Sequence, residues 1–198
     1  MTTITNSSNT KARNGVWTPW AQVLCVECDY TALKDSPRAP HYEKHLKTVA
    51  AMDRTAEVER PDGHELGVCN ECRRPCWTRT DVALLQQVGF RSSDLDWEGP
   101  FGWALQQTGG MCAALVFQAD TREIVVTAMD SYFFIGEYRR IPDDSNEEPW
   151  IDAIRTWQSE PLYADDELKP STELGVLADQ CARQVIEFVR TPTVEQTP

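Results

Sequence analysis

The sequence predicts an α+β protein built in two parts. Two Cys-x2-Cys pairs, Cys25/Cys28 and Cys69/Cys72, lie within the first 80 residues. Three short runs rich in β-branched and aromatic residues follow residue 111, and an amphipathic stretch closes the chain. The cysteine pairs indicate a small N-terminal metal-binding module. The later runs indicate a three-stranded antiparallel meander with a packed C-terminal helix.

The elements of the N-terminal module (residues 16–80) are predicted from local patterns. Residues 1–15 are polar with almost nothing to bury, so we expect a flexible tail. Residues 16–28 are expected to form a strand that ends in the first cysteine pair. Residues 40–54 read as a helix with proline in its first turn. Residues 57–60 and 64–68 are expected to form a hairpin through a Pro-Asp-Gly turn.

The second part (residues 81–190) is predicted as an acidic α+β domain. A short helix over 81–88 should end at Gly89, and 92–102 has a loop composition. Strands are expected over 112–118, 123–128 and 132–138, in a meander because their connections are too short for parallel crossovers. A helix over 149–157 and a last helix capped by Ser171 or Thr172 complete the domain, before a flexible tail over 191–198. The last helix carries an apolar stripe of Leu174, Leu177, Ala178, Cys181, Val185, Phe188 and Val189.

Charge divides unevenly between the two parts. Residues 1–80 hold 11 basic and 10 acidic side chains, a net charge of +1, whereas residues 81–198 hold 8 basic and 21 acidic, a net charge of −13. A nucleic-acid-binding surface is normally basic, so the second part would repel phosphate. Its acidity either keeps the protein dispersed or allows it to dock on a basic protein surface.

Membrane and secretion signals are missing from this sequence. It has no run of about 18 apolar residues, and its first ten residues lack the basic start and apolar core of a signal peptide. Its seven cysteines are an odd number, which disfavours a complete disulfide framework. We therefore expect a cytoplasmic protein with reduced or metal-bound thiols and no membrane partner.

The cysteine pairs are the strongest chemical signal. Two thiolates spaced by two residues suit one tetrahedral ion, and zinc is the usual metal of sulfur-rich tetrahedral sites. Cys25, Cys28, Cys69 and Cys72 together resemble a zinc ribbon with a helical insert between its two knuckles. That resemblance implies one structural zinc ion bound by four thiolates.

A second arrangement uses histidine. The spacing Cys25-x2-Cys28-x12-His41-x3-His45 resembles the two-Cys/two-His zinc finger. The resemblance implies His41 and His45 one turn apart on a helix, both facing the ion held by the first pair. Cys69, Cys72, Cys76 and His64 could then hold a second ion. The sequence leaves the one-ion and two-ion arrangements open.

Catalytic motifs are hard to find in this chain. It has no nucleophile elbow, phosphate loop, dinucleotide fingerprint or His-Glu-x-x-His helix. Cys112, after two glycines, is the one local candidate nucleophile, and a histidine would have to reach it from elsewhere. A closed four-ligand zinc site is structural. We therefore expect a non-enzymatic protein.

A weak overall resemblance concerns residues 107–117 and the cysteine-rich region before them, which look like uncharacterised small proteins of actinobacterial phages. It implies a phage or mobile-element origin and a location in the host cytoplasm.

The predicted function is that of a zinc-binding interaction factor whose acidic face binds a basic host protein or complex that handles nucleic acid or defence. The alternative is a zinc-finger nucleic-acid-binding regulator with a basic face of Lys44, Lys47, Arg54, Arg73, Arg74 and Arg79.

Overall fold

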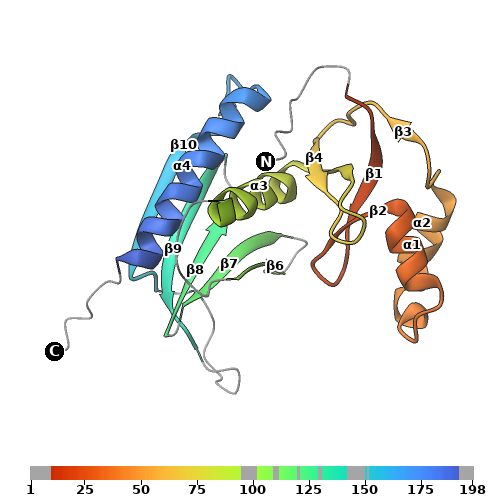
Figure 1. Cartoon of the computed structure of the whole chain (residues 1–198), viewed down its shortest axis with the longest axis horizontal. Helices are drawn as coiled ribbons and strands as arrows, with labels where there is room; N and C mark the ends of the chain where they lie inside the picture. Colours follow the sequence, from red (N-terminus) through yellow and green to blue (C-terminus); the bar gives the residue numbers. More distant parts are fainter. Residues whose placement is uncertain are drawn as a thin grey trace. The chain divides into compact units, whose positions relative to one another are not determined.

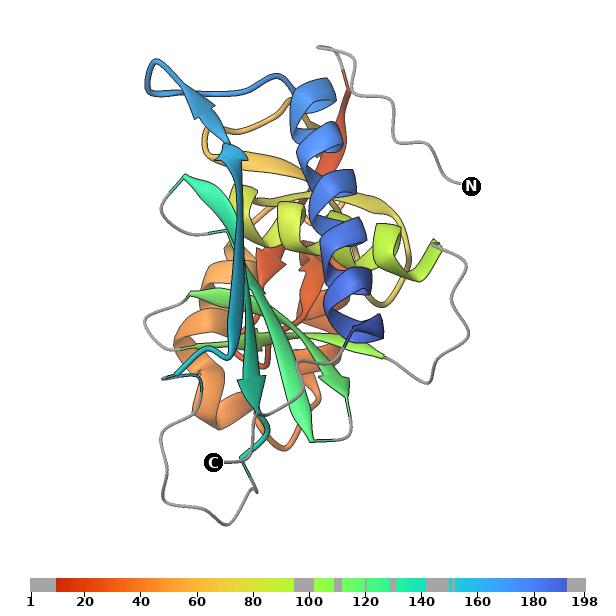
Figure 2. The same cartoon turned by 90° about the vertical axis from the view of Figure 1, so that its left-hand side faces the viewer.

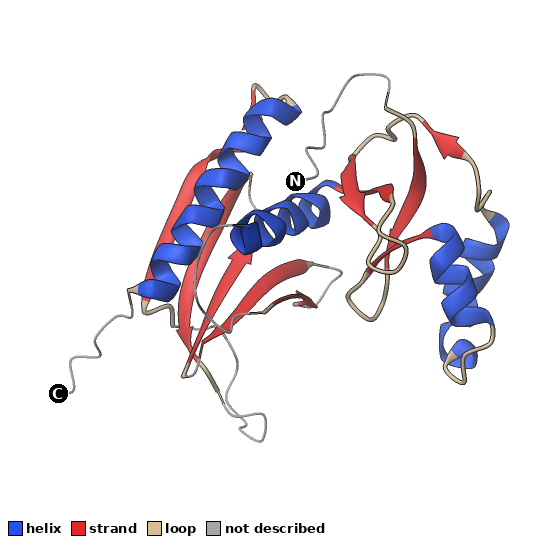
Figure 3. Cartoon of the chain, in the orientation of Figure 1, coloured by secondary structure: helices blue, strands red, loops and turns tan. Residues whose placement is uncertain are grey.

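The structure, a computed structural model, describes residues 10–94, 102–108, 112–119, 121–128, 131–141, 150 and 152–191. The chain has a mixed α+β architecture and divides into two compact units, Met1–Leu84 and Leu85–Pro198 (Figures 1 and 3). Within the described ranges, no helix is both long and apolar enough to cross a membrane.

Five strands of the first unit form one sheet in the order β2-β1-β5-β4, with β3 also pairing with β1. Strands β1 and β5 run parallel, and the other pairs are antiparallel. The expected tail over residues 1–15 is therefore wrong for residues 12–15, which pair within the sheet, while residues 1–9 lie outside the described ranges. The strands are β1 (Ala12–Trp17), β2 (Val23–Cys25), β3 (Glu57–Val58), β4 (His64–Val68) and β5 (Pro75–Arg79).

The hairpin predicted between residues 57–60 and 64–68 is wrong. Strand β3 pairs with β1, and β4 pairs with β5. The reason lies in the apolar cluster of Ala12, Leu66 and Trp77, against which Val58 packs. Because Trp77 Nε1 also donates a hydrogen bond to Val58 O at 2.9 Å, β3 is held beside β1 rather than folded back on β4.

The strand predicted over residues 16–28 is interrupted by a turn. Ala21 adopts a positive φ of 59° between β1 and β2, and the chain then enters helix α1 (Val26–Lys34) directly. The helix predicted over residues 40–54 is a 3-10 turn, η1 (Ala39–Tyr42), followed by helix α2 (Glu43–Ala51). Helices α1 and α2 pack on one another.

Helix α3 (Thr80–Asp94) is longer than the predicted 81–88. Gly89 lies inside it, where its missing side chain leaves room for an aromatic ring. A Cβ at Gly89 would lie 2.6 Å from an atom of the Trp103 ring. Trp103 also meets Phe90 edge-on at 5.3 Å between centroids. Of the predicted loop 92–102, residues 92–94 are helical, Gly102 is not in an element, and residues 95–101 lie outside the described ranges.

The main sheet of the second unit is antiparallel, in the order β10-β9-β8-β7-β6. The three predicted strands are its β7, β8 and β9, so the predicted three-stranded sheet was too small. The helix predicted over 149–157 is wrong, because residues 155–157 belong to β10, where Trp157 pairs with Ile135. The strands are β6 (Trp103–Gln107), β7 (Ala113–Ala119), β8 (Arg122–Thr127), β9 (Tyr132–Arg139) and β10 (Arg155–Pro161).

Helix α4 (Ser171–Arg190) packs on β8, β9 and β10 (Figure 2). The predicted apolar stripe is confirmed, since every one of its seven residues is buried. The predicted serine or threonine cap is wrong, because Pro170 stands at the N-cap and no side chain caps the helix. Before α4, a small hairpin is formed by β11 (Tyr163–Ala164) and β12 (Glu167–Leu168). Of the predicted tail 191–198, only Thr191 is described.

A buried carboxylate fixes the end of α4 to the sheet. The Glu137 side chain on β9 is fully buried and accepts hydrogen bonds from Arg122 at 2.5 Å and Arg155 at 3.0 Å. Both arginines also donate to the last carbonyls of α4, including Phe188 O at 3.3 and 3.0 Å. A helix leaves its final carbonyls unpaired, so two cations there satisfy them and oppose the negative end of the helix dipole.

Replacing Gly89 by alanine is expected to destabilise the protein by about 1–3 kcal/mol, because the new methyl group would overlap the Trp103 ring. Gly175→Ala in α4 is the matched control. There a Cβ would lie 3.3 Å from the flexible end of Arg91, so the higher helix propensity of alanine should leave stability unchanged or raise it by about 0.5–1 kcal/mol. Urea unfolding followed by circular dichroism measures both, and equal effects would contradict the contact with Trp103.

Candidate metal centre

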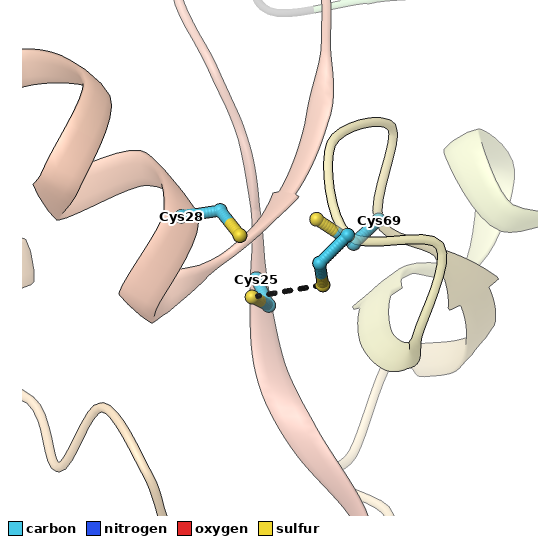
Figure 4. A group of neighbouring side chains, drawn as sticks. Cys25, Cys28 and Cys69 are labelled. Carbon is cyan, nitrogen blue, oxygen red and sulfur yellow. Dashed lines mark hydrogen bonds between the residues drawn. The ribbon is translucent and has the colours of Figure 1, made fainter.

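Four sulfur atoms from the two cysteine pairs gather in the first unit. The Sγ atoms of Cys25, Cys28, Cys69 and Cys72 all lie within 4.8 Å of one another (Figure 4). Cys25 Sγ lies 3.8 Å from Cys72 Sγ. A tetrahedral ion with metal–sulfur bonds of about 2.3 Å needs sulfur–sulfur distances of about 3.8 Å. The cluster therefore has the dimensions to hold one metal ion.

The first pair sits where a strand becomes a helix. Cys25 ends β2 and stands at the N-cap of α1, with extended backbone angles, and Cys28 lies in the first turn of that helix. The positive end of a helix dipole favours a thiolate over a thiol. The first pair therefore lies at a helix start, rather than at the end of the strand predicted over residues 16–28, and both sulfurs lie at one end of α1.

The second pair sits in the loop between β4 and β5. The Cys69 N–H donates to Arg74 O, and the Arg73 N–H donates to Cys69 O, both at 3.0 Å. This tight loop requires Arg73 to adopt a positive φ of 60°, a conformation that disfavours side chains other than glycine. The loop turns the sulfurs of Cys69 and Cys72 to the same side.

Asn70 connects the two pairs. Its backbone N–H donates to Val23 O at 2.8 Å, and its side-chain oxygen accepts from the Val23 N–H at 3.0 Å. These two hydrogen bonds fix the β4–β5 loop beside β2, two residues before Cys25. Sequence reasoning missed Asn70, although an asparagine inside the Cys-Asn-Glu-Cys motif was a visible signal that its side chain serves the loop.

The surroundings act differently on the thiols of Cys25, Cys28 and Cys69. Burial raises the pKa of Cys25, partly opposed by the Cys28 N–H, and burial raises the pKa of Cys28 well above its ordinary value. Burial also opposes ionisation of Cys69, yet the backbone N–H groups of Cys25, Cys72 and Glu71 bring its pKa below the ordinary value. The four groups can all be thiolates when a cation lies among them, because its charge reverses the cost of burial.

One cationic side chain accompanies the cluster. Arg13 on β1 forms an ion pair with Glu27, and its pKa is raised first by the hydrogen bond to Glu27 and further by the charge of Cys25. A guanidinium beside Cys25 offsets part of the negative charge that four thiolates would leave on a divalent ion.

The two predicted histidine ligands are not brought to the cluster. Among the residues that the structure describes, the group within metal-binding distance consists of the four cysteines and includes neither His41 nor His45. His41 is exposed in η1. His45 Nε2 instead lies 2.7 Å from Asp29 Oδ2 on α1, and the ring of Trp20 meets the His45 ring edge-on. The pair of Asp29 and His45 joins α2 to α1.

Asp29 is a buried carboxylate that sequence reasoning missed. Its side chain is fully buried, and burial raises its pKa while the contact with His45 opposes that rise. In the sequence, Asp29 directly follows Cys28, and no pattern there distinguishes a buried carboxylate from a solvent-exposed one.

The remaining cysteines lie outside the cluster. Cys76 is buried on β5, burial raises its pKa, and a Cβ at Gly15 would lie 2.9 Å from its sulfur. Neither Cys76 nor His64, whose Nδ1 lies 2.9 Å from Asp62 O, joins the four sulfurs, so the arrangement with a second ion is not formed in the described residues. Cys112 is half-buried before β7, and Cys181 is buried in α4.

Comparisons with protein-family models, with curated proteins and with solved structures found no match.

Replacing Arg73 by glycine is expected to stabilise the protein by up to about 1 kcal/mol, because glycine adopts the positive φ of this loop without steric cost. Arg74→Gly is the matched control, since it removes a neighbouring exposed arginine where no positive φ occurs, and it should be neutral or destabilising. Thermal unfolding of the two variants provides the comparison. An Arg73→Gly protein less stable than the Arg74→Gly protein would argue against the loop conformation.

Proposed function

We propose that Cys25, Cys28, Cys69 and Cys72 hold one zinc ion, and that the protein is a non-catalytic zinc-binding interaction factor. The cluster of four sulfur atoms carries this proposal. Four thiolates in a tetrahedron of this size suit zinc better than the harder divalent ions, which prefer oxygen. Four protein ligands close the coordination sphere and leave no position for a substrate or an activated water.

The ion would act as a cross-link within the first unit. Two ligands stand at the junction of β2 and α1, and two stand in the β4–β5 loop, more than 40 residues later. Closing such a long loop costs chain entropy, and metal–thiolate bonds offset that cost. The zinc ion would thereby supply folding free energy rather than chemistry.

The charge distribution supports a protein partner for the second unit. Residues 1–84 hold 11 basic and 11 acidic side chains, so their net charge is zero. Residues 85–198 hold 8 basic and 20 acidic side chains and therefore carry the whole net charge of −12. We infer that an acidic surface of this unit binds a basic protein surface, such as one in a host complex that handles nucleic acid or defence.

Nucleic-acid binding by the first unit is less well supported. Of the six basic residues proposed for it, Lys47 pairs with Glu43 at 2.5 Å and Arg79 pairs with Asp81 at 2.6 Å. Arg54 stacks over the Tyr30 ring at 4.1 Å. These contacts, and the zero net charge, reduce the positive potential that phosphate recognition needs.

Elemental analysis of protein purified without added metal should find one zinc ion per chain. Cys69→Ser should lose that zinc and make residues 10–84 sensitive to limited proteolysis, because a small metallo-unit derives much of its stability from the ion. Cys112→Ser is the matched control and should keep one zinc. Two ions per chain would contradict the single site, and folded protein without any transition metal would overturn the zinc proposal.

The partner is tested with the full chain as bait. Captured proteins should be basic, and their retention should fall at least about tenfold between about 0.05 and 0.5 M salt, since the attraction is electrostatic. A variant with Asp165→Asn, Asp166→Asn and Glu167→Gln removes three negative charges from the exposed β11–β12 hairpin. It should fold normally but retain the captured proteins more weakly. Salt-dependent binding to duplex DNA or RNA, without capture of basic proteins, would favour the regulator instead.

A further inference from the structure

Each cysteine pair contains one buried and one half-buried member. Cys25 and Cys69 are completely buried, whereas Cys28 and Cys72 are partly exposed. Thiolates are oxidised according to their ionisation and their accessibility to the oxidant. If the cluster holds zinc as proposed, all four sulfurs are thiolates, and accessibility decides which reacts first.

Cys72 stands in more exposed surroundings than Cys28, the other partly exposed member. Its neighbours Glu71 and Arg73 are both exposed, in a loop on the surface of the first unit. Cys28 lies in α1 between half-buried Glu27 and fully buried Asp29.

Cys25 is placed to complete the reaction. Its sulfur lies 3.8 Å from that of Cys72, although 47 residues separate the two in the sequence. We propose that the metal centre is an oxidation-sensitive switch, in which hydrogen peroxide attacks at Cys72, a disulfide forms between Cys72 and Cys25, and the zinc ion is released. This inference rests on the zinc site of the proposed function.

The chemistry balances in two steps. The Cys72 thiolate attacks one oxygen of hydrogen peroxide, the O–O bond breaks, and a sulfenic acid and hydroxide form. The Cys25 thiolate then attacks the sulfenic sulfur, the S–S bond forms and a second hydroxide leaves. Two protons convert the hydroxides to water, so two thiolates lose two electrons and one peroxide gains them.

Release of the metal follows from the loss of two ligands. The sulfurs of a disulfide are poor metal ligands, so only Cys28 and Cys69 would remain as thiolates. A dithiol reductant would restore both thiolates and, with zinc present, the closed site. The same four residues would thus alternate between a metal cross-link and a covalent cross-link.

The sequence permits an unambiguous test on the zinc-loaded full-length protein. A glutamate-specific protease cuts after Glu27, between Cys25 and Cys28, and after Glu71, between Cys69 and Cys72. Trypsin adds a cut after Arg73, which separates Cys72 from Cys76. Mass spectrometry then identifies every possible disulfide among these five cysteines.

With about one equivalent of hydrogen peroxide, we expect one zinc ion to be released for each disulfide formed, and Cys25–Cys72 to be the main linkage. Zinc release is followed with a chromogenic chelator, and a dithiol should reverse it.

Cys76→Ser and Cys112→Ser are the matched controls, because each removes a thiol outside the cluster and keeps its four ligands. Both variants should release zinc at a rate within about twofold of the rate measured for the unmodified protein. A main linkage within either pair, a linkage to Cys76, or retention of zinc at complete peroxide consumption would overturn the switch while leaving the zinc site standing. Protein that contains no zinc before oxidation would overturn the proposed zinc site and the switch together.

Discussion

Four sulfur atoms within 4.8 Å of one another can all be ionised only when a cation lies among them, and the first unit is organised around this constraint. The start of α1, the N–H groups that point at Cys69 and the guanidinium of Arg13 each favour negative charge at this point. None of them carries the two positive charges of a divalent ion. The loop conformation at Arg73 and the hydrogen bonds of Asn70 help to hold the four sulfur atoms in place.

The second unit also buries negative charge. Its buried charge is the carboxylate of Glu137, and two arginines from neighbouring strands neutralise it. Each arginine also donates hydrogen bonds to backbone carbonyls at the end of α4. The Glu137 carboxylate therefore orients both guanidinium groups toward the end of this helix. Removing one partner of such a buried pair typically costs about 3–5 kcal/mol. In the second unit, side chains alone are thus sufficient to bury a charge.

The sequence was informative where a pattern reports directly on chemistry or burial. The spacing of the cysteine pairs predicted which four sulfur atoms lie together, and the period of α4 predicted its buried face. It was uninformative where a distant contact decides the outcome. A glycine near the end of a helical pattern usually marks the end of the helix. Gly89 instead lies inside α3, and the Trp103 ring packs where its side chain would be. The helical spacing of Trp157 is overridden because that residue pairs with Ile135 across the sheet. The histidine spacing suited a zinc finger equally well, and only the buried Asp29 explains why His45 turns elsewhere.

The separation of the two cysteine pairs along the chain has a consequence for folding during synthesis. Cys28 emerges from the ribosome 44 residues before Cys72, an interval of about 2–9 s at ordinary elongation rates. Strand β1 must also wait for its parallel neighbour β5, where Arg13 is opposite Cys76. During this interval the nascent chain carries two thiols without their metal-binding partners. The complete sheet of the first unit, and with it the cluster of four sulfurs, can therefore form only when the last strand of that unit has been made.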